Sequence, residues 1–277
     1  MVEEWRVMGL DINDAYTNMA IDEAICRLRS QGSSPNTLRL YRWKPSAVSI
    51  GYFQILEQEV DVGACKNLGI DIVRRMTGGG AVYHSYEGEL TYSVIVNQDN
   101  PQIPRDILQS YEIICSGIVM ALNDLGIKSD FRPINDIDVN GKKISGNAQT
   151  RRGNVVLQHG TILIDTDIKT MFTVLKVSKE KISDKLIKSV EERVTTIRRE
   201  IGKRISFNDV AEALKKSFPK VLDMTLVETG LSKEEKDLAS KLKQEKYCTQ
   251  EWIYHRPSSW NEVYSHPNSN PETHKSF

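Results

Sequence analysis

The chain has 277 residues, enough for one large or two small domains, and its 39% hydrophobic and 27% charged residues are typical of a globular protein. Lysine plus arginine and aspartate plus glutamate both number 37, so the formal net charge is zero. Because proteins that bind nucleic acid backbones usually carry a basic excess, this balance excludes nucleic acid as a principal partner. No apolar run is long enough to span a bilayer, and the acidic start lacks the pattern of a signal peptide, so we expect a cytoplasmic protein.

The first half of the chain predicts one helix and several short strands. Residues 17–29 carry apolar side chains at helical spacing. Residues 37–43, 47–50, 70–75 and 90–96 are short runs rich in β-branched and aromatic residues, which favours strands.

The centre of the chain predicts a long helix followed by an antiparallel meander. Residues 106–126 show the clearest helical spacing, and Gly126 supplies a stop. Asn140-Gly141 lies between two strand-like runs and predicts a hairpin. A second turn at 152–154 leads into a strand over 155–164.

The rest of the chain is helical and charged. Ser232 and Glu235 form a capping box that opens a helix. The basic segment 193–204 is interpreted as a solvated helix face or, as the alternative, a docking surface for an acidic partner. The order of elements predicts an α+β fold, a mixed and largely antiparallel β-sheet flanked by helices, with one domain over 1–256 and a flexible tail over 257–277.

A glycine-rich segment at the end of a strand is the first candidate for chemistry. Three consecutive glycines, 78–80, follow the pair Arg74 and Arg75. Glycines let the backbone approach a ligand closely and point several N–H groups into one concavity, which favours anions. Arginine adds a forked, permanently charged donor, so the segment predicts a phosphate or carboxylate site. The alternative is a flexible hairpin loop.

The hairpin around Asn140-Gly141 is the second candidate. Strand alternation places Lys142 and Lys143 on opposite faces, so we expect one to face the ligand. Asp136 is a candidate partner for a magnesium ion or a ribose hydroxyl. Small residues beside the lysines leave space for a bound molecule: Ser145, Gly146 and Ala148. Taken alone, the hairpin fits a polar surface turn equally well.

Together the two segments resemble the lipoate–protein ligase family, which shares a fold with octanoyltransferases and biotin–protein ligases. The resemblance runs from about Trp5 to Trp252, and Trp43-Lys-Pro-Ser-Ala-Val-Ser-Ile-Gly-Tyr-Phe-Gln54 and Gln158-His-Gly-Thr-Ile-Leu163 carry much of it. It implies that Lys143 is the essential lysine and that His84 and His159 lie near the ligand. The acyl-adenylate site that it implies contains Arg75, Gly78, Gly79, Gly80, Ala81, Val82, Tyr83, His84, Asp136, Lys143, Ser145, Gly146, Ala148 and His159.

The resemblance implies ATP-dependent activation of lipoate to lipoyl-AMP, with Mg²⁺, and transfer of the lipoyl group to a lysine of a lipoyl domain. An apolar slot for the acyl chain is expected from Ile21, Trp43, Val48 and Val82. Two alternatives remain: a cysteine-dependent octanoyltransferase or amidotransferase without ATP, and a non-catalytic lipoate-binding subunit. The first alternative needs an exposed, activated thiol. None of the four cysteines (Cys26, Cys65, Cys115, Cys248) lies within the lysine segment, which favours the ligase.

The expected partners are lipoyl domains of 2-oxoacid dehydrogenases or the glycine-cleavage H protein. Many ligases of this kind carry a further C-terminal domain, and in some two-component members a second polypeptide supplies it. Because this sequence ends soon after Trp252, we expect a separate accessory subunit.

Overall fold

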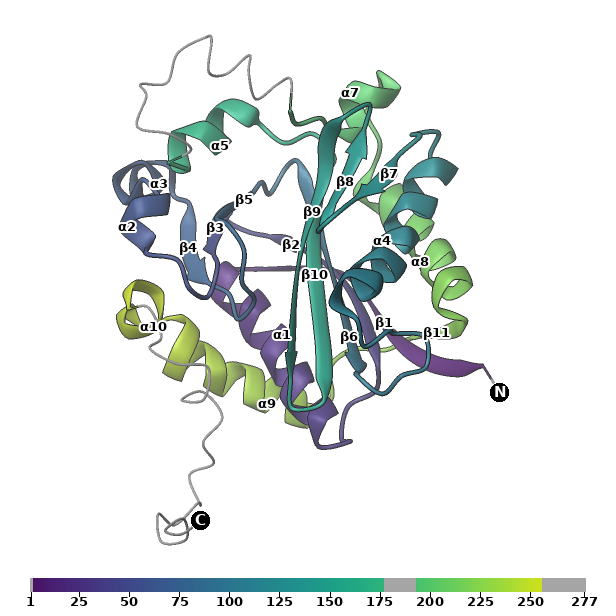
Figure 1. Cartoon of the computed structure of the whole chain (residues 1–277). Helices are drawn as coiled ribbons and strands as arrows, with labels where there is room; N and C mark the ends of the chain where they lie inside the picture. Colours follow the sequence, from purple (N-terminus) through teal and green to yellow (C-terminus); the bar gives the residue numbers. More distant parts are fainter. Residues whose placement is uncertain (1, 177–192, 256–277) are drawn as a thin grey trace, which may run out of the picture.

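The structure is a computed structural model that describes residues 2–176 and 193–255. Its described part is built on one large sheet of eight strands in the order β11-β1-β2-β6-β10-β9-β8-β7 (Figure 1). The strands of this large sheet are β1 (Glu3–Asn13), β2 (Thr37–Trp43), β6 (Glu89–Asn97), β7 (Asp130–Arg132), β8 (Asp136–Val139), β9 (Lys142–Arg152), β10 (Val155–Leu163) and β11 (Met224–Glu228). β1 is parallel to both β2 and β11, and the other pairs are antiparallel.

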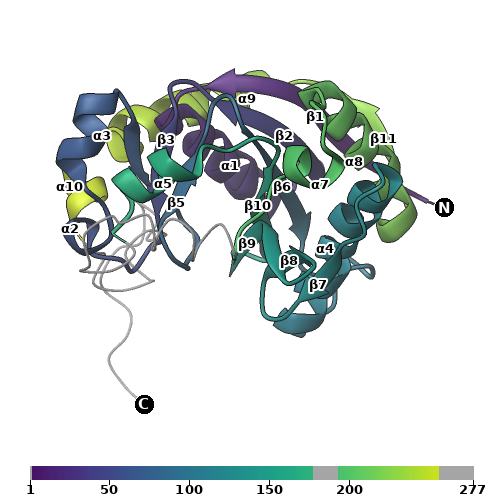
Figure 2. The same cartoon turned by 90° about the horizontal axis from the view of Figure 1, so that it is seen from above.

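A small sheet of three strands lies beside the large one, in the order β4-β3-β5. Its strands are β3 (Ala47–Ile50), β4 (Asp71–Arg74) and β5 (Val82–His84). The glycine-rich segment connects β4 to β5, so the small sheet presents that segment toward the large sheet. Figure 2 shows β3 and β5 on one side of β9 and β10, and α4 and α8 on the other.

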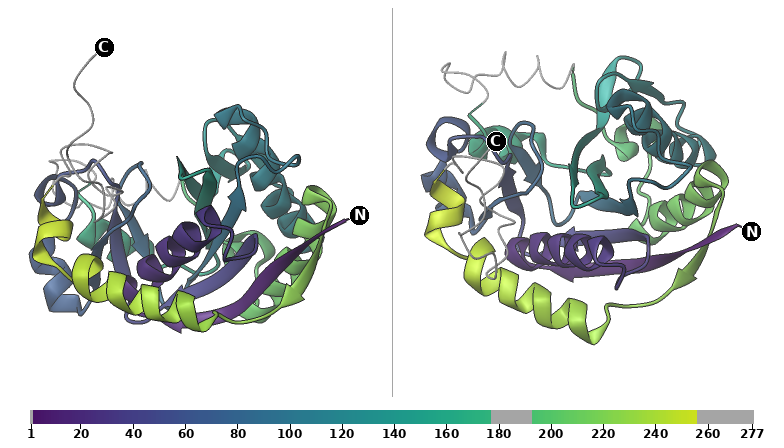
Figure 3. Two further views of the ribbon diagram at one scale, coloured as in Figure 1. Left: turned by 90° about the horizontal axis from the view of Figure 1, so that it is seen from below. Right: turned by 60° about the horizontal axis from the view of Figure 1, so that its bottom comes forward.

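Helices cover both faces of the large sheet. The helices of the described residues are α1 (Ala15–Ser30), α2 (Leu56–Glu59), α3 (Val62–Leu68), α4 (Ile107–Asp124), α5 (Ile168–Val174), α7 (Ile197–Ile201), α8 (Phe207–Leu222), α9 (Lys233–Leu242) and α10 (Gln250–Tyr254), with a π-helical turn at Lys243–Tyr247. α2, α3, α5 and α10 pack around the small sheet. α4 and α8 pack on one face, and α1 packs on the other with α9 alongside it (Figure 3). No helix in the described ranges is long and apolar enough to cross a membrane.

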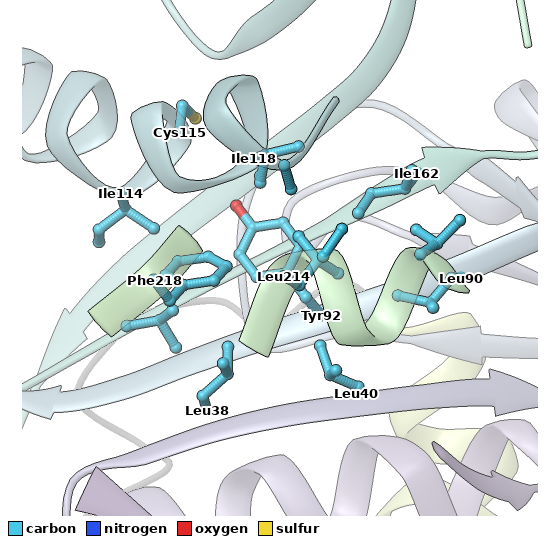
Figure 4. Packing of buried hydrophobic residues seen from close by; sticks show 14 of the residues in the cluster. Leu38, Leu40, Leu90, Tyr92, Ile114, Cys115, Ile118, Ile162, Leu214 and Phe218 are labelled. Atoms are coloured by element: carbon cyan, nitrogen blue, oxygen red, sulfur yellow. The ribbon is translucent and has the colours of Figure 1, made fainter. Parts of the chain in front are cut away.

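Strand alternation explains the two cores on the opposite faces of the large sheet. Leu38 and Leu40 of β2 point toward α4 and α8, where they pack with Tyr92, Ile118 and Phe218 (Figure 4). The intervening Tyr41 of the same strand belongs to the core beneath α1. Burying apolar side chains on both faces is the main contribution to the stability of such a sheet.

The structure confirms the predicted α+β class and its largely antiparallel sheet. The Asn140-Gly141 hairpin forms, with φ of 50° and 77° at the two residues, as expected for a tight turn between β8 and β9. β1 and β11 were not predicted, because neither carries a local turn signal. The predicted helix from Ser232 begins with its capping box in place. The expected tail over 257–277 lies outside the described residues.

Candidate active site

A pocket of about 270 Å³ lies between the small sheet and strands β9 and β10. It brings together both segments that the sequence singled out. The predicted residues that line it are Arg75, Gly79, Gly80, Ala81, Val82, Tyr83, His84, Lys143, Gly146, Ala148 and His159. Gly78, Asp136 and Ser145 do not line it.

Arg75 stabilises the glycine-rich loop by hydrogen bonds to its backbone. Its guanidinium donates to the carbonyl oxygens of Gly78 and Gly80 at 2.7 and 2.8 Å, and to the backbone oxygen of Ser49 at 3.1 Å. Burial lowers the pKa of Arg75 to about 10, so the group is still cationic at neutral pH. Arg74 likewise donates to backbone carbonyls, including that of Gly51. In this structure backbone carbonyls accept most of the hydrogen bonds from this pair, and the hydroxyls of Thr77 and Ser49 also contact Arg75, so the forked donor to an anion stays a prediction.

Gly51 allows the glycine-rich loop to close over the end of β3. A Cβ atom at Gly51 would lie 2.0 Å from the carbonyl oxygen of Gly79, which is backbone and cannot rotate away. The conformation of the pocket wall at Gly79 and Gly80 therefore depends on the absence of a side chain at residue 51.

Replacing Gly51 with alanine is expected to displace this loop and to raise KM for the substrate bound in the pocket by about tenfold. The strain should also lower the free energy of unfolding by about 1–3 kcal/mol. Steady-state kinetics and denaturant unfolding measure the two effects. Gly63→Ala is the matched control, since a Cβ there would meet only the side chain of Asp61 at 3.4 Å. An unchanged KM in Gly51→Ala would contradict the proposed packing.

Lys143 is held in the pocket from three directions. Its Nζ lies 2.6 Å from Asp136 Oδ1. Its backbone N–H donates to Arg193 O at 2.8 Å, and its carbonyl accepts from Thr195 N at 2.9 Å. The absence of a side chain at Gly146 leaves space for the side chain of Lys143, because a Cβ at residue 146 would lie 2.5 Å from Lys143 Cε. The first residues of segment 193–204, which was predicted as a basic helix face, therefore hold the backbone of Lys143 in place.

The magnesium role of Asp136 stays a prediction, and in this structure both carboxylate oxygens of Asp136 face cations. One of its carboxylate oxygens contacts Lys143 and the other lies 3.0 Å from Arg132, so both lone-pair sets face cations. Nowhere in residues 2–176 and 193–255 do three metal-ligating His, Cys, Asp or Glu side chains gather. In this structure the carboxylate of Asp136 holds the ammonium of Lys143 in place.

The apolar wall of the pocket differs in part from the expectation. Trp43 and Val82 line it as predicted. Ile21 and Val48 are instead packed in the cores beneath α1 and around β3. Apolar lining residues that the sequence analysis missed are Met19, Tyr41, Leu163, Met171, Leu175 and Val194. They come from α1, β2, β10, α5 and the segments that follow α5 and precede α7, far apart in the chain, and no local pattern identifies them. Other lining residues that were not predicted are Ser49, Thr91, Asn135, Asn147, Thr161 and the glycine Gly160.

The two predicted histidines both reach the pocket, and both are hydrogen-bonded. His159 Nε2 lies 2.7 Å from Thr77 Oγ1 and Nδ1 lies 3.5 Å from Asp22 Oδ2. Burial lowers the pKa of His159 below its ordinary value and outweighs the hydrogen bond and charge of Asp22, so the ring is neutral at pH 7. His84 stacks on Trp43, with ring centroids 4.0 Å apart.

No cysteine lines the pocket. All four belong to the described part of the chain; Cys26, Cys65 and Cys115 are buried and Cys248 is exposed. Burial raises the pKa of Cys115 to about 12, and it also raises the pKa of the exposed Cys248. None of these thiols is an activated nucleophile in this structure.

The comparison with known proteins decides the family. Residues 14–219 match the model of the lipoyl protein ligase A/B catalytic domain. The chain belongs to this family. Octanoyltransferase LipM from Brevibacillus brevis is 35% identical, over 92% of this chain and 100% of that protein. Octanoyltransferase LipM from Kyrpidia tusciae is 37% identical over the same shares of the two chains. A bipartite lipoate protein ligase from Thermoplasma acidophilum superposes with a TM-score of 0.82 at 33% identity, covering 93% of this chain and 98% of that one.

These relatives contradict the predicted ATP-dependent lipoate ligase. Octanoyltransferases match this chain over their full length at 35 and 37% identity. A lipoate protein ligase matches almost as well, so overall similarity alone does not separate the two activities. The chain is therefore an enzyme of the ligase A/B transferase family, and the transferase alternative is the better supported of the two.

Proposed function

We propose that the chain transfers an octanoyl-class acyl group from a thioester donor to the amine of a lysine on a lipoyl-domain protein. One observation carries the proposal: a single pocket joins an apolar wall, which includes Met19, Trp43 and Leu163, to the ammonium of Lys143. An apolar wall suits a medium-length alkyl chain, and a cation fixed by Asp136 suits the carbonyl at its end. The octanoyltransferase relatives support the same chemistry.

In the overall reaction, an amide bond to the acceptor replaces the thioester bond of the donor. The amine nitrogen of the acceptor lysine bonds to the carbonyl carbon, the C–S bond of the donor breaks, and the donor leaves as a thiol that takes up the proton lost by the amine. Negative charge develops on the carbonyl oxygen on the way. The ammonium of Lys143 stabilises that charge. ATP has no part in this reaction.

The acceptors that we propose are lipoyl domains of 2-oxoacid dehydrogenases or the glycine-cleavage H protein. The accessory subunit stays a prediction, and adding a candidate subunit to the assay described below would test it.

The test is acyl transfer to an apo lipoyl domain, followed by intact-protein mass spectrometry. Two donors are compared: an octanoyl thioester of an acyl carrier protein without ATP, and free octanoate with ATP and Mg²⁺. A lipoyl domain with its acceptor lysine replaced by alanine is the control. We expect a mass increase of one octanoyl group from the thioester alone. Product from octanoate that depends on ATP, with none from the thioester, would refute the proposal.

A further inference from the structure

A serine, a histidine and a glutamate form a continuous hydrogen-bonded chain in the pocket wall. Ser49 Oγ of β3 lies 2.8 Å from His84 Nε2 of β5. His84 Nδ1 lies 2.8 Å from Glu89 Oε2 at the start of β6. Ser49 and His84 both line the pocket, and Glu89 is buried behind them.

The neighbouring groups decide the direction of these hydrogen bonds. Trp43 Nε1 donates to Thr91 Oγ1 at 2.7 Å, so the Thr91 hydroxyl hydrogen is free to donate to Glu89, with which it is paired. Glu89 therefore accepts from Thr91 on one oxygen and from His84 on the other, as a carboxylate does. With the proton on Nδ1, Nε2 of the neutral ring is an acceptor, and the hydroxyl of Ser49 donates to it.

A fixed cation lies beside the same hydroxyl. Arg75 Nη1 is 3.3 Å from Ser49 Oγ, on a guanidinium that the glycine-rich loop holds in place. The Trp43 ring stacks on His84 with an interplanar angle of 18°, which fixes the plane of the imidazole. A base that accepts the proton and a cation that stabilises the developing alkoxide are the two features that activate a serine.

We propose that Ser49 is the nucleophile that carries the acyl group between donor and acceptor. This proposal rests on the proposed function. Ser49 would take the place of a cysteine nucleophile, since none of the four cysteines lines the pocket. The Ser49 side chain is almost fully buried, so a donor carbonyl reaches it only from inside the pocket, where bulk water has little access to the resulting ester.

The two half-reactions balance without any co-reactant. In the first, Ser49 Oγ bonds to the thioester carbonyl carbon, its proton passes to His84 Nε2, the C–S bond breaks, and the proton leaves with the sulfur as a thiol. In the second, the acceptor amine bonds to the ester carbonyl carbon and gives a proton to His84 Nε2. That proton returns to Ser49 Oγ as the C–O bond breaks.

The experiment traps the acylated enzyme. The full chain is mixed with an octanoyl thioester without acceptor, quenched rapidly, and examined by intact mass and peptide mapping. We expect one octanoyl group on the peptide that contains Ser49 and no adduct in Ser49→Ala. In Ser49→Cys we expect a thioester adduct that neutral hydroxylamine cleaves to octanoyl hydroxamate and the free thiol. Ser46→Ala is the control, because the Ser46 hydroxyl accepts from the Tyr86 amide outside this chain of bonds and should leave acylation unchanged.

Transfer to the lipoyl domain is measured in the same samples. If Ser49→Ala transfers at the wild-type rate, or if the adduct maps to another residue, the nucleophile proposal is overturned while the proposed function stands. If wild-type protein makes no octanoylated acceptor from the thioester, the proposed function itself fails. A serine that only positions His84 and Arg75 would give slower transfer in Ser49→Ala but no covalent adduct in the wild type, which also overturns the proposal.

Discussion

Lys143→Ala is expected to lower kcat for acyl transfer by about 10²–10³-fold, because it removes the charge that stabilises the developing oxyanion. The loss should appear mainly in kcat, since the apolar wall that holds the alkyl chain is unchanged. Single-turnover transfer from an octanoyl thioester measures the chemical step directly.

The control for this variant is the adjacent lysine. Lys142 does not line the pocket, so Lys142→Ala should keep kcat within about twofold of wild type. Thermal unfolding of both variants tests whether the protein remains folded. Equal activity in Lys143→Ala and Lys142→Ala would remove Lys143 from the mechanism.

Glu23→Gln is expected to lower the free energy of unfolding by about 3–5 kcal/mol, because it breaks a buried ionic network. Glu23 on α1 is fully buried and contacts Lys246 at 2.6 Å, Arg27 at 2.5 Å and Tyr247 at 2.5 Å. The substitution removes the carboxylate that Lys246 and Arg27 contact and loosens the C-terminal turn from α1. Urea unfolding at pH 7 measures the change.

The control and the pH dependence make this prediction specific. Glu245 forms an exposed pair with Lys241 at 3.9 Å, so Glu245→Gln should change stability by less than about 0.5 kcal/mol.

Burial opposes ionisation of Glu23, but the charges of Lys246 and Arg27 outweigh it and lower its pKa to about 2, from an ordinary value of 4.5. The unfolded chain therefore takes up a proton below about pH 4.5 while the folded chain does not until about pH 2. The difference in stability between wild type and Glu23→Gln should shrink across that window, and a constant difference would contradict the assignment.

Local features of the fold were predictable because their causes are local. Asn140 and Gly141 adopt the positive φ that a tight hairpin requires, whatever the rest of the chain does. Ser232 and Glu235 satisfy the first N–H groups of α9 within a single helical turn. β11 escaped prediction because its pairing partner, β1, lies more than 200 residues away in the sequence.

The sequence by itself determined the α+β class, the family, and the two segments that carry Lys143 and the glycine-rich loop. Only the tertiary structure decided what those residues contact. It turned Arg75 toward backbone carbonyls, paired Asp136 with Lys143, and kept every cysteine out of the pocket. It also placed Ser49 beside His84, since β3 and β5 pair across a connection of 31 residues. Contacts of this kind depend on strand pairing over long separations, and no short-range pattern in the sequence encodes them.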